Sequence, residues 1–507
     1  MNSVFPIKKN GVIAQQQNAD LLKLFSVCYL ILPVILFLIF WFKIEIVVPA
    51  IVVVIVVCVS YFRNLHLTFN PNILNFSLKK HILLPAFALF ICLFSGIGGF
   101  VFQGDFLKHY AMLHDLVYLD WPVIYTQSSE ITFLNYYFAY FLPPAFLAKI
   151  TLPELVDNYI IIWTALGLYL SFRWFICFAG NKNIWLPVCF MLFLGGQDFL
   201  YAFLKFFLQS ASLENNDSAW QIFQQEISTV CVFHNTVLRY PTNFFAISWA
   251  PQHLIGAWLV TSVLIKNYLS QSNQKYSIFI LSFLPIWSVF NAVGLIPIML
   301  ACYLRNRNGI FSWQNILGGG VILILTGFFY LAHSSVSEQG WLWEFIPLKA
   351  LTFKWMLFLL FEFGYIAVVI HSFIIKSEWR YLYLSSLIFM SLLPVYVLGY
   401  MNDLLMRAAV PSIFVINLLA FLYYQQNRFK YKKVIMVVIL VGVLLPQVLT
   451  IASYMPEFTK FHVENGFSES RVRVQNSKIL IELTDENWFN TQYFGRNDSF
   501  YYKYLAR

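Results

Sequence analysis

Long apolar segments separated by short polar ones dominate this sequence. The first is Leu21–Phe42, and after a tight turn at Lys43–Glu45 the chain continues through Ile46–Phe62 and then Ile82–Phe102. Each has about the 20 residues that an α-helix needs to cross the hydrocarbon core of a bilayer. Leu21–Phe42 is also too long for the core of a signal peptide, so we expect it to be retained as a span.

The same pattern continues to the last fifth of the chain. Further apolar segments cover Ile131–Ile150, Tyr159–Ala179, Ile184–Leu208, Phe244–Ile265, Ile278–Leu304, Arg380–Tyr400, Leu404–Tyr424 and Val434–Tyr454. Pro143-Pro144, Gly195-Gly196 and the group Asn291, Gly294 and Pro297 predict breaks inside three of them, which a membrane tolerates where protein or water supplies partners. We therefore predict an all-α polytopic membrane protein with roughly 12–14 transmembrane helices.

The amino-acid composition supports a membrane protein and excludes a soluble globular one. The 507 residues are 60% hydrophobic and only 11% charged, with a mean hydropathy of +0.68, which no soluble globular protein matches. The net charge of +9 comes from basic residues in short linkers. That distribution marks cytoplasmic loops and predicts no nucleic-acid partner. The seven cysteines lie singly, so neither a zinc site nor a disulfide framework is indicated, and no residue is assigned as a metal ligand. No nucleotide-binding motif is present either, so we expect no nucleotide-driven transport.

The basic linkers also predict the sidedness of the chain. Lys79–His81, Lys376–Arg380 and Arg428–Lys433 are expected in the cytoplasm. Residues 1–20 are then a cytoplasmic N-terminus, and 21–454 form the transmembrane domain with an extracytoplasmic loop at 103–130. Residues 455–507 form a short extracytoplasmic tail, in which Lys478–Leu483 alternates weakly like a strand and the aromatic residues near the end predict a cap lying against the membrane.

The loop Gln103–Val123 concentrates ionisable groups directly after an apolar segment. On a helix, Asp105, Lys108 and His109 would share a face, because positions three and four apart are neighbours. Asp115 follows within the same loop. Two interpretations stay open here: a site of chemistry, or a solvated amphipathic helix whose charges meet water and lipid headgroups.

Four further residues or pairs interrupt apolar segments, where ionisable groups are costly and usually functional. Tyr137 lies in an aromatic stripe, for which packing is the alternative. Asp198 follows the glycine pair, and its alternative is a solvated turn. His253 follows Pro251 in Trp249-Ala-Pro-Gln-His, and the alternative is a satisfied buried histidine. Asp403 and Arg407 lie one turn apart, and the alternative to phosphate binding by Arg407 is a structural ion pair.

These words together resemble the GT-C superfamily, the polytopic glycosyltransferases that use polyprenyl-phosphate sugars. The resemblance rests on Gly104-Asp-Phe-Leu-Lys-His in the first large outer loop, Trp249-Ala-Pro-Gln-His, and Asn402-Asp403 with Arg407, and it spans residues ~80–420, most like uncharacterised bacterial GT-C-like membrane proteins. The chain departs from the family in having two additional spans before the acidic loop and in lacking an adjacent Asp-Glu pair there.

The resemblance implies transfer of a sugar from a polyprenyl-phosphate carrier to an extracytoplasmic glycan, lipid or protein. The enzyme would lie in the bacterial inner membrane, among its lipids, with the active site facing the periplasm. Asp105 is then the expected base, and His109 and Asp115 are orienting or alternative acid–base groups. The expected substrate-binding residues are Lys108, Tyr137, Asp198, His253, Asp403 and Arg407. The cofactor stays undetermined, and the family admits a divalent cation, Mg²⁺ or Mn²⁺.

A transporter or flippase for a lipid-linked or small substrate is the alternative. The same buried histidine, carboxylates and arginine would then line a path across the membrane. Transporters typically carry paired repeats with broken helices in corresponding halves, and no such symmetry is visible in this sequence. A polymerase or ligase of lipid-linked sugars would need a large arginine-rich outer loop, whereas Leu208–Tyr240 contains only Arg239.

Overall fold

The computed structural model is mostly helical. It describes residues 9–65, 78–93, 95–97, 105–126, 131–180, 183–195, 232–233, 236–238, 240–333, 339–399, 402–426, 474, 477, 479–484 and 493–507. The longer helices are α1 (Lys9–Trp41), α2 (Ile44–Arg63), α3 (Leu78–Leu93), α4 (Asp105–Tyr118), α6 (Val156–Ala179), α11 (Pro251–Leu269), α15 (Gly320–Leu331), α17 (Leu348–Leu359), α19 (Arg380–Leu392) and α21 (Val410–Gln426). The shorter ones are α5 (Leu142–Ile150), α7 (Trp185–Phe193), α10 (Asn243–Trp249), α12 (Ser277–Leu281), α13 (Val289–Gly294), α14 (Ile296–Arg305), α16 (Leu342–Phe345), α18 (Tyr365–Ile374), α20 (Asp403–Ala408) and α23 (Leu480–Thr484).

Five helical segments of the described chain are long and apolar enough to cross a membrane. They are Ala19–Trp41, Ile44–Arg63, Pro153–Ala179, Gln314–Leu331 and Trp355–Ile374. The last two each contain a π-helical turn, at Gln314–Gly319 and Leu360–Gly364. A membrane-embedded helical protein is therefore confirmed in outline, and the count of twelve to fourteen spans stays a prediction.

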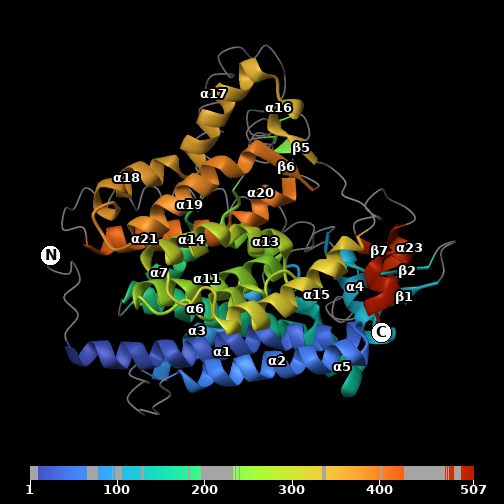
Figure 1. Cartoon of the computed structure of the whole chain (residues 1–507). Helices are drawn as coiled ribbons and strands as arrows, with labels where there is room; N and C mark the ends of the chain where they lie inside the picture. The colour runs from blue at the N-terminus through green and yellow to red at the C-terminus, as the bar shows by residue number, and fades with distance from the viewer. Residues whose placement is uncertain are drawn as a thin grey trace.

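Two helices that contact one another are buried along most of their length: α11, which runs through the middle of the body (Figure 1), and α21. Every residue from Pro251 to Ile265 of α11 is buried, and so is every residue from Val410 to Tyr423 of α21. A helix that is apolar all round is stable where protein surrounds it. By contrast, α2 exposes Val48, Val52 and Ile55, each about half accessible, as expected for a helix that faces lipid.

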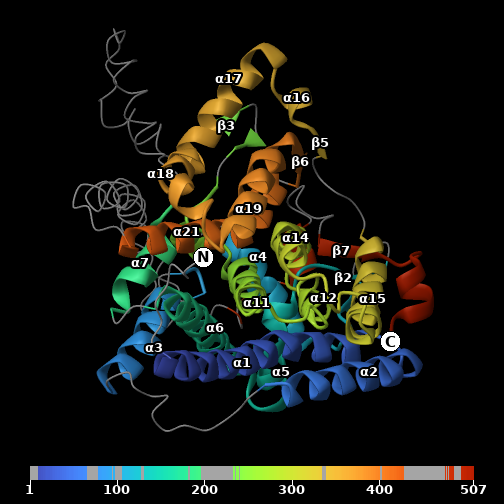
Figure 2. The same cartoon turned by 60° about the vertical axis from the view of Figure 1, so that its left-hand side comes forward.

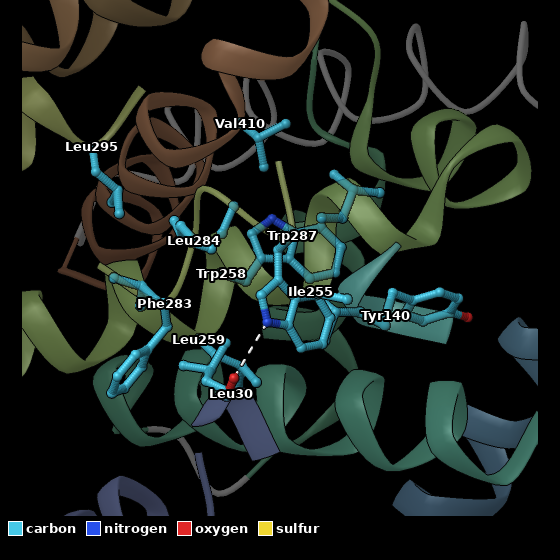
Figure 3. Packing of buried hydrophobic residues seen from close by; sticks show 14 of the residues in the cluster. Leu30, Tyr140, Ile255, Trp258, Leu259, Phe283, Leu284, Trp287, Leu295 and Val410 are labelled. Atoms are coloured by element: carbon cyan, nitrogen blue, oxygen red, sulfur yellow. Dashed lines mark hydrogen bonds between the residues drawn. The ribbon is translucent and has the colours of Figure 1, made fainter. Parts of the chain in front are cut away.

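A tryptophan outside the regular helices connects the central helix to α1. Trp287 lies between α12 and α13, and its indole N–H donates to the backbone oxygen of Leu30 at 3.3 Å (Figure 3). Gly256 of α11 permits this packing, because a Cβ there would lie only 3.1 Å from Leu284 and 3.2 Å from Trp287. Both indoles in this region, Trp258 and Trp287, are fully buried.

Two predicted spans are wrong as continuous helices. Ile131–Ile150 contains the strand β2 (Thr132–Leu134), a 3-10 turn at Ala139–Phe141, and only then α5. Arg380–Tyr400 is helical to Leu392, after which a 3-10 turn leads into the strand β6 (Tyr396–Leu398). The strand β6 pairs antiparallel with β5 (Gln339–Trp341), from which α16 and α17 project beside the body (Figure 2). The apolar side chains of these two segments are typical of a transmembrane helix. The backbone groups of β2 and β6, however, form hydrogen bonds with other strands.

The predicted breaks are largely confirmed. The segment Ile278–Leu304 divides into α12, α13 and α14, with α13 ending at Gly294 and Pro297 in the first turn of α14. Pro143 and Pro144 lie in the first turn of α5, after the strand and 3-10 turn that precede it. A further break that was not predicted divides Phe244–Ile265 at Ala250 into α10 and α11. α7 ends at Phe193, just before Gly195. Val434–Tyr454 and residues 196–200 lie outside the described residues.

The described C-terminal residues pack against the body, and their position relative to the membrane stays a prediction. The strand β7 (Phe494–Arg496) pairs with β2, which also pairs with β1 (Ile124–Tyr125). The last residues continue onto the α1–α2 turn, where the Lys43 amide donates to the Leu505 oxygen at 2.9 Å. Tyr501 is buried, and its hydroxyl donates to the Trp41 oxygen at 2.8 Å. Residues 480–484 are helical, so the expectation of a strand at Lys478–Leu483 is wrong.

The first and last described residues lie toward opposite ends of the body. One end carries β1, β2, β7, α4 and the C-terminus, and the N-terminal part of α1 lies at the other (Figure 1). Arg305, at the end of α14, bonds the backbone and side chain of Glu378 at 2.8 and 3.1 Å, in the linker that also holds Lys376 and Arg380. Basic side chains also lie at the C-terminal end, where Lys43 bonds the Lys503 oxygen and Arg496 pairs with Asp498. The common cytoplasmic side of the basic linkers therefore stays a prediction.

Sidedness can be tested with two exposed positions. In a variant without native cysteines, we expect Asp498→Cys, beside β7, to react with a membrane-impermeant maleimide in intact cells. Asn308→Cys, in the turn after α14, should react only after the membrane is permeabilised, because Arg305, just before this turn, bonds the Lys376–Arg380 linker, which is expected in the cytoplasm. Labelling of Asn308→Cys alone in intact cells would reverse the orientation.

Candidate functional site

Arg407 is placed by a short helix that begins at an unusual residue. Asn402 adopts a left-handed conformation, with φ of 57°, and its side-chain oxygen accepts the amide of Leu405 at 3.4 Å. Asparagine tolerates this conformation and caps helices well. α20 therefore begins at Asp403, and one turn later Arg407 Nη2 lies 2.7 Å from Asp403 Oδ1. The predicted Asp–Arg pair is present, with both side chains largely buried.

Two aromatic rings flank the guanidinium. Its central carbon lies 5.8 Å from the ring centres of both Tyr137 and Phe290, within the range of cation–π attraction. Tyr137 also meets the imidazole of His253 at 5.6 Å between ring centres, with the rings at 76°. Tyr137 thus joins Arg407 of α20 to His253 of α11.

The first turn of α11 brings two polar side chains into this region. Pro251 is the first residue of the helix, so Gln252 and His253 follow immediately at its start. Both are buried, with 1% and 2% of their surface exposed. Gln252 Nε2 lies 3.3 Å from His109 Nε2, which connects α11 to α4.

A close approach between α13 and α20 completes the group. A side chain at Gly294 would overlap the carbonyl oxygen of Ala408, so only glycine allows the two helices to touch here. On α13, the amide nitrogen of Asn291 donates to the backbone oxygen of His253. The Arg407 cluster, as we name it, comprises His109, Tyr137, Gln252, His253, Asn291, Asp403 and Arg407.

The C-terminal segment forms one wall of this cluster. Tyr493 lies 4.4 Å from Tyr136 between ring centres, and the Asn135 amide donates to the Tyr493 oxygen at 2.8 Å. The Tyr136 side chain bonds both Arg407 and Tyr493. Residues more than 350 positions apart in sequence therefore meet around one guanidinium.

The structure brings together only some of the predicted site residues. The Arg407 cluster contains five of them: His109, Tyr137, His253, Asp403 and Arg407.

Asp105 is the first residue of α4, one turn before His109, and Lys108 is partly buried on the same helix. Asp198 lies outside the described residues.

Asp115 is directed elsewhere. Six residues beyond His109, it lies about 120° away around α4 at 3.6 residues per turn. Its Oδ2 accepts the Tyr125 hydroxyl at 2.7 Å and the Leu480 amide at 3.0 Å, and Oδ1 lies 3.2 Å from His114 Nδ1. The carboxylate is fully buried; burial raises its pKa, and these contacts with Tyr125, Leu480 and His114 oppose that rise. This environment ties α4 to β1 and the C-terminal segment.

Gln252 and Asn291 were not among the predicted site residues. The available signal was a polar amide inside an otherwise apolar segment, which for Asn291 suggested only a helix break. Their place next to His253 depends on contacts between α4, α11 and α13.

The cluster offers one permanent cation and several neutral polar groups. Arg407 presents five N–H donors, of which Asp403 and Tyr136 use some, and such a fork suits a phosphate. Within the described residues, no group of three or more His, Cys, Asp or Glu side chains has a geometry that could hold a metal ion.

Comparisons with protein-family models, curated proteins and solved structures find no match to this chain. The functional argument therefore rests on the geometry of the cluster.

The contacts of Asp115 predict a structural role. Asp115→Ala leaves the Tyr125 hydroxyl and the Leu480 amide buried without their acceptor, which costs about 1–3 kcal/mol for each group. We expect a lower midpoint of thermal unfolding in detergent and faster proteolysis of the C-terminal segment. Asp115→Asn, which keeps an acceptor oxygen, should lose less, and Asp498→Ala, at an exposed carboxylate, should change neither. Lost turnover with unchanged stability in Asp115→Ala would return this residue to the chemistry.

Proposed function

We propose that this chain is an integral membrane glycosyltransferase that moves a sugar from a polyprenyl-phosphate carrier to an extracytoplasmic glycan, lipid or protein. One observation carries the proposal: α4, which begins at Asp105, meets the Arg407 cluster through His109 and Gln252. A helix that begins at an aspartate thus contacts, through His109, a cluster that also holds a cation suited to phosphate. The same chain has five helices long and apolar enough to cross a membrane among its described residues.

The reaction needs a base at one side of the sugar and cations at the other. The acceptor hydroxyl attacks the anomeric carbon while Asp105 takes its proton, and the bond from that carbon to the phosphate oxygen breaks. Arg407 and Lys108 stabilise the negative charge that the leaving carrier phosphate gains. His109, one turn after Asp105, is held by Gln252 and fixes the orientation of α4.

The sequence favours an enzyme over a carrier. Transporters typically carry paired repeats with broken helices in corresponding halves, and no such symmetry is visible along this chain. A flippase would move the lipid-linked sugar across the membrane unchanged, and an enzyme consumes it. Proteoliposomes containing radiolabelled polyprenyl-phosphate sugar distinguish the two outcomes.

Asp105→Asn tests the proposed base. The amide keeps the shape of the side chain but cannot take a proton, so we expect sugar transfer in membranes supplied with polyprenyl-phosphate sugar to fall by about 10²–10⁴. Expression and carrier binding should stay near normal. Asp120→Asn, at an exposed carboxylate that follows the same helix, is the matched control and should remain active. Full activity of Asp105→Asn would show that another group is the base.

Arg407→Lys separates a phosphate-binding arginine from a purely structural one. Lysine keeps a positive charge near Asp403 but lacks the planar fork of donors. We expect turnover to fall at least about tenfold while the unfolding midpoint stays close to that of the wild type. Arg496→Lys, in the exposed Arg496–Asp498 pair, is the control. If Arg407→Lys and Arg407→Ala were both active and stable, the assignment would be wrong.

A further inference from the structure

Several buried polar atoms of the Arg407 cluster have no hydrogen-bond partner among the described residues. They are Gln252 Oε1, Asn291 Oδ1 and both ring nitrogens of His253. The three residues expose no more than 2% of their surface. Buried polar groups in native proteins are nearly always paired. These unpaired atoms belong to two consecutive residues of α11 and to Asn291, whose side chain bonds the backbone of His253, so we expect a ligand here.

Neighbouring contacts hold these atoms in place. The nitrogen end of the Asn291 amide is engaged by the backbone oxygen of His253, and the nitrogen end of the Gln252 amide lies beside His109. The oxygen ends are therefore the ones left available. The His253 ring is set against Tyr137, which restricts its rotation.

The chemistry of these atoms differs from that of Arg407. An amide oxygen only accepts hydrogen bonds. A phosphate group that is fully ionised also has only acceptor atoms, so neither group can donate to the other. Phosphate therefore cannot satisfy Gln252 or Asn291. A hydroxyl group can donate to an amide oxygen and accept from an imidazole N–H, so a molecule with several hydroxyls matches this set.

We propose that Gln252, His253 and Asn291 form the subsite that binds the hydroxyl groups of the transferred sugar, separate from the phosphate site at Arg407. This inference rests on the proposed function and adds one detail to it, since it assigns His253 to the sugar while Arg407 and Lys108 bind the phosphate. Tyr137 contacts both His253 and Arg407, so the two subsites lie one aromatic ring apart. A sugar linked directly to a phosphate has the same arrangement of hydroxyls beside an anion.

Binding of two kinds of lipid to the purified full chain tests the inference. The probes are polyprenyl phosphate alone and polyprenyl phosphate carrying glucose, mannose or arabinose, with affinities measured by native mass spectrometry. His253→Phe keeps the aromatic packing against Tyr137 and removes both nitrogens. We expect it to weaken the best-bound glycosylated lipid roughly tenfold while the bare carrier changes less than about twofold. Gln252→Met should act in the same direction, and Arg407→Ala should weaken both lipids.

Two further variants are controls for the loss of any buried polar group and for a packing defect. Ser262 lies further along α11, and its buried side-chain hydroxyl also has no partner among the described residues. Ser262→Ala removes this hydroxyl and should change the affinity for neither lipid. His253→Gln restores a donor and an acceptor and should recover part of the affinity for the glycosylated lipid, which a mere packing defect would not allow.

The outcomes separate this inference from the function on which it rests. Equal weakening of both lipids by His253→Phe, or no weakening of either, would overturn the sugar subsite while leaving a carrier-binding enzyme. Equal binding of bare and glycosylated carrier by the wild type would do the same. If the wild type bound none of the lipids, the proposed function would fail, and the subsite with it.

Discussion

Helix breaks beside three prolines impose the constraint on which the site depends. A proline weakens the interior of a helix, because it lacks an N–H and its ring clashes with the carbonyl four residues earlier. Long helices can absorb this cost, as α1, α2 and α3 do at Pro33, Pro49 and Pro85. Pro251, Pro297 and Pro411 each lie in the first turn of a helix that follows a break, at the starts of α11, α14 and α21. In an apolar body the backbone groups freed at such breaks must find partners in the protein. The breaks beside these prolines place the polar residues of the cluster near one another.

A charged group inside this body can persist only with partners. Removing an ion from water is costly, and a buried pair offsets that cost only if its remaining hydrogen-bonding groups are also satisfied. Arg407 has Asp403 one turn away, the Tyr136 side chain beside it and two aromatic rings flanking it. Tyr136 is in turn supported by Tyr493 from the C-terminal segment. A structural pair and a phosphate-binding role are compatible, because the guanidinium has more donors than the pair uses.

Much of the architecture could be predicted from local sequence. The length and uniform hydropathy of Leu21–Phe42, Ile46–Phe62 and Tyr159–Ala179 correspond to helices that the structure contains, because a helix satisfies its own backbone and needs only an apolar environment. Ile131–Ile150 and Arg380–Tyr400 have the same composition but contain strands. Hydropathy reports that a segment is removed from water, and it does not report whether its backbone partners are local or lie on another strand.

The residues of the site could likewise be identified from sequence, but their grouping could not. Sequence alone identified Arg407, His253, Tyr137 and His109 as polar or aromatic candidates, since an ionisable group in an apolar segment is costly wherever the chain folds. It also put Asp115 with them, and the structure pairs Asp115 with Tyr125 and Leu480 instead. Which candidates meet depends on the direction that each side chain takes from its helix and on contacts between distant segments. Composition and spacing determined the class of the protein and the costly residues, and only tertiary packing decided which of them share a site, because partners for buried polar groups are chosen in space and not along the chain.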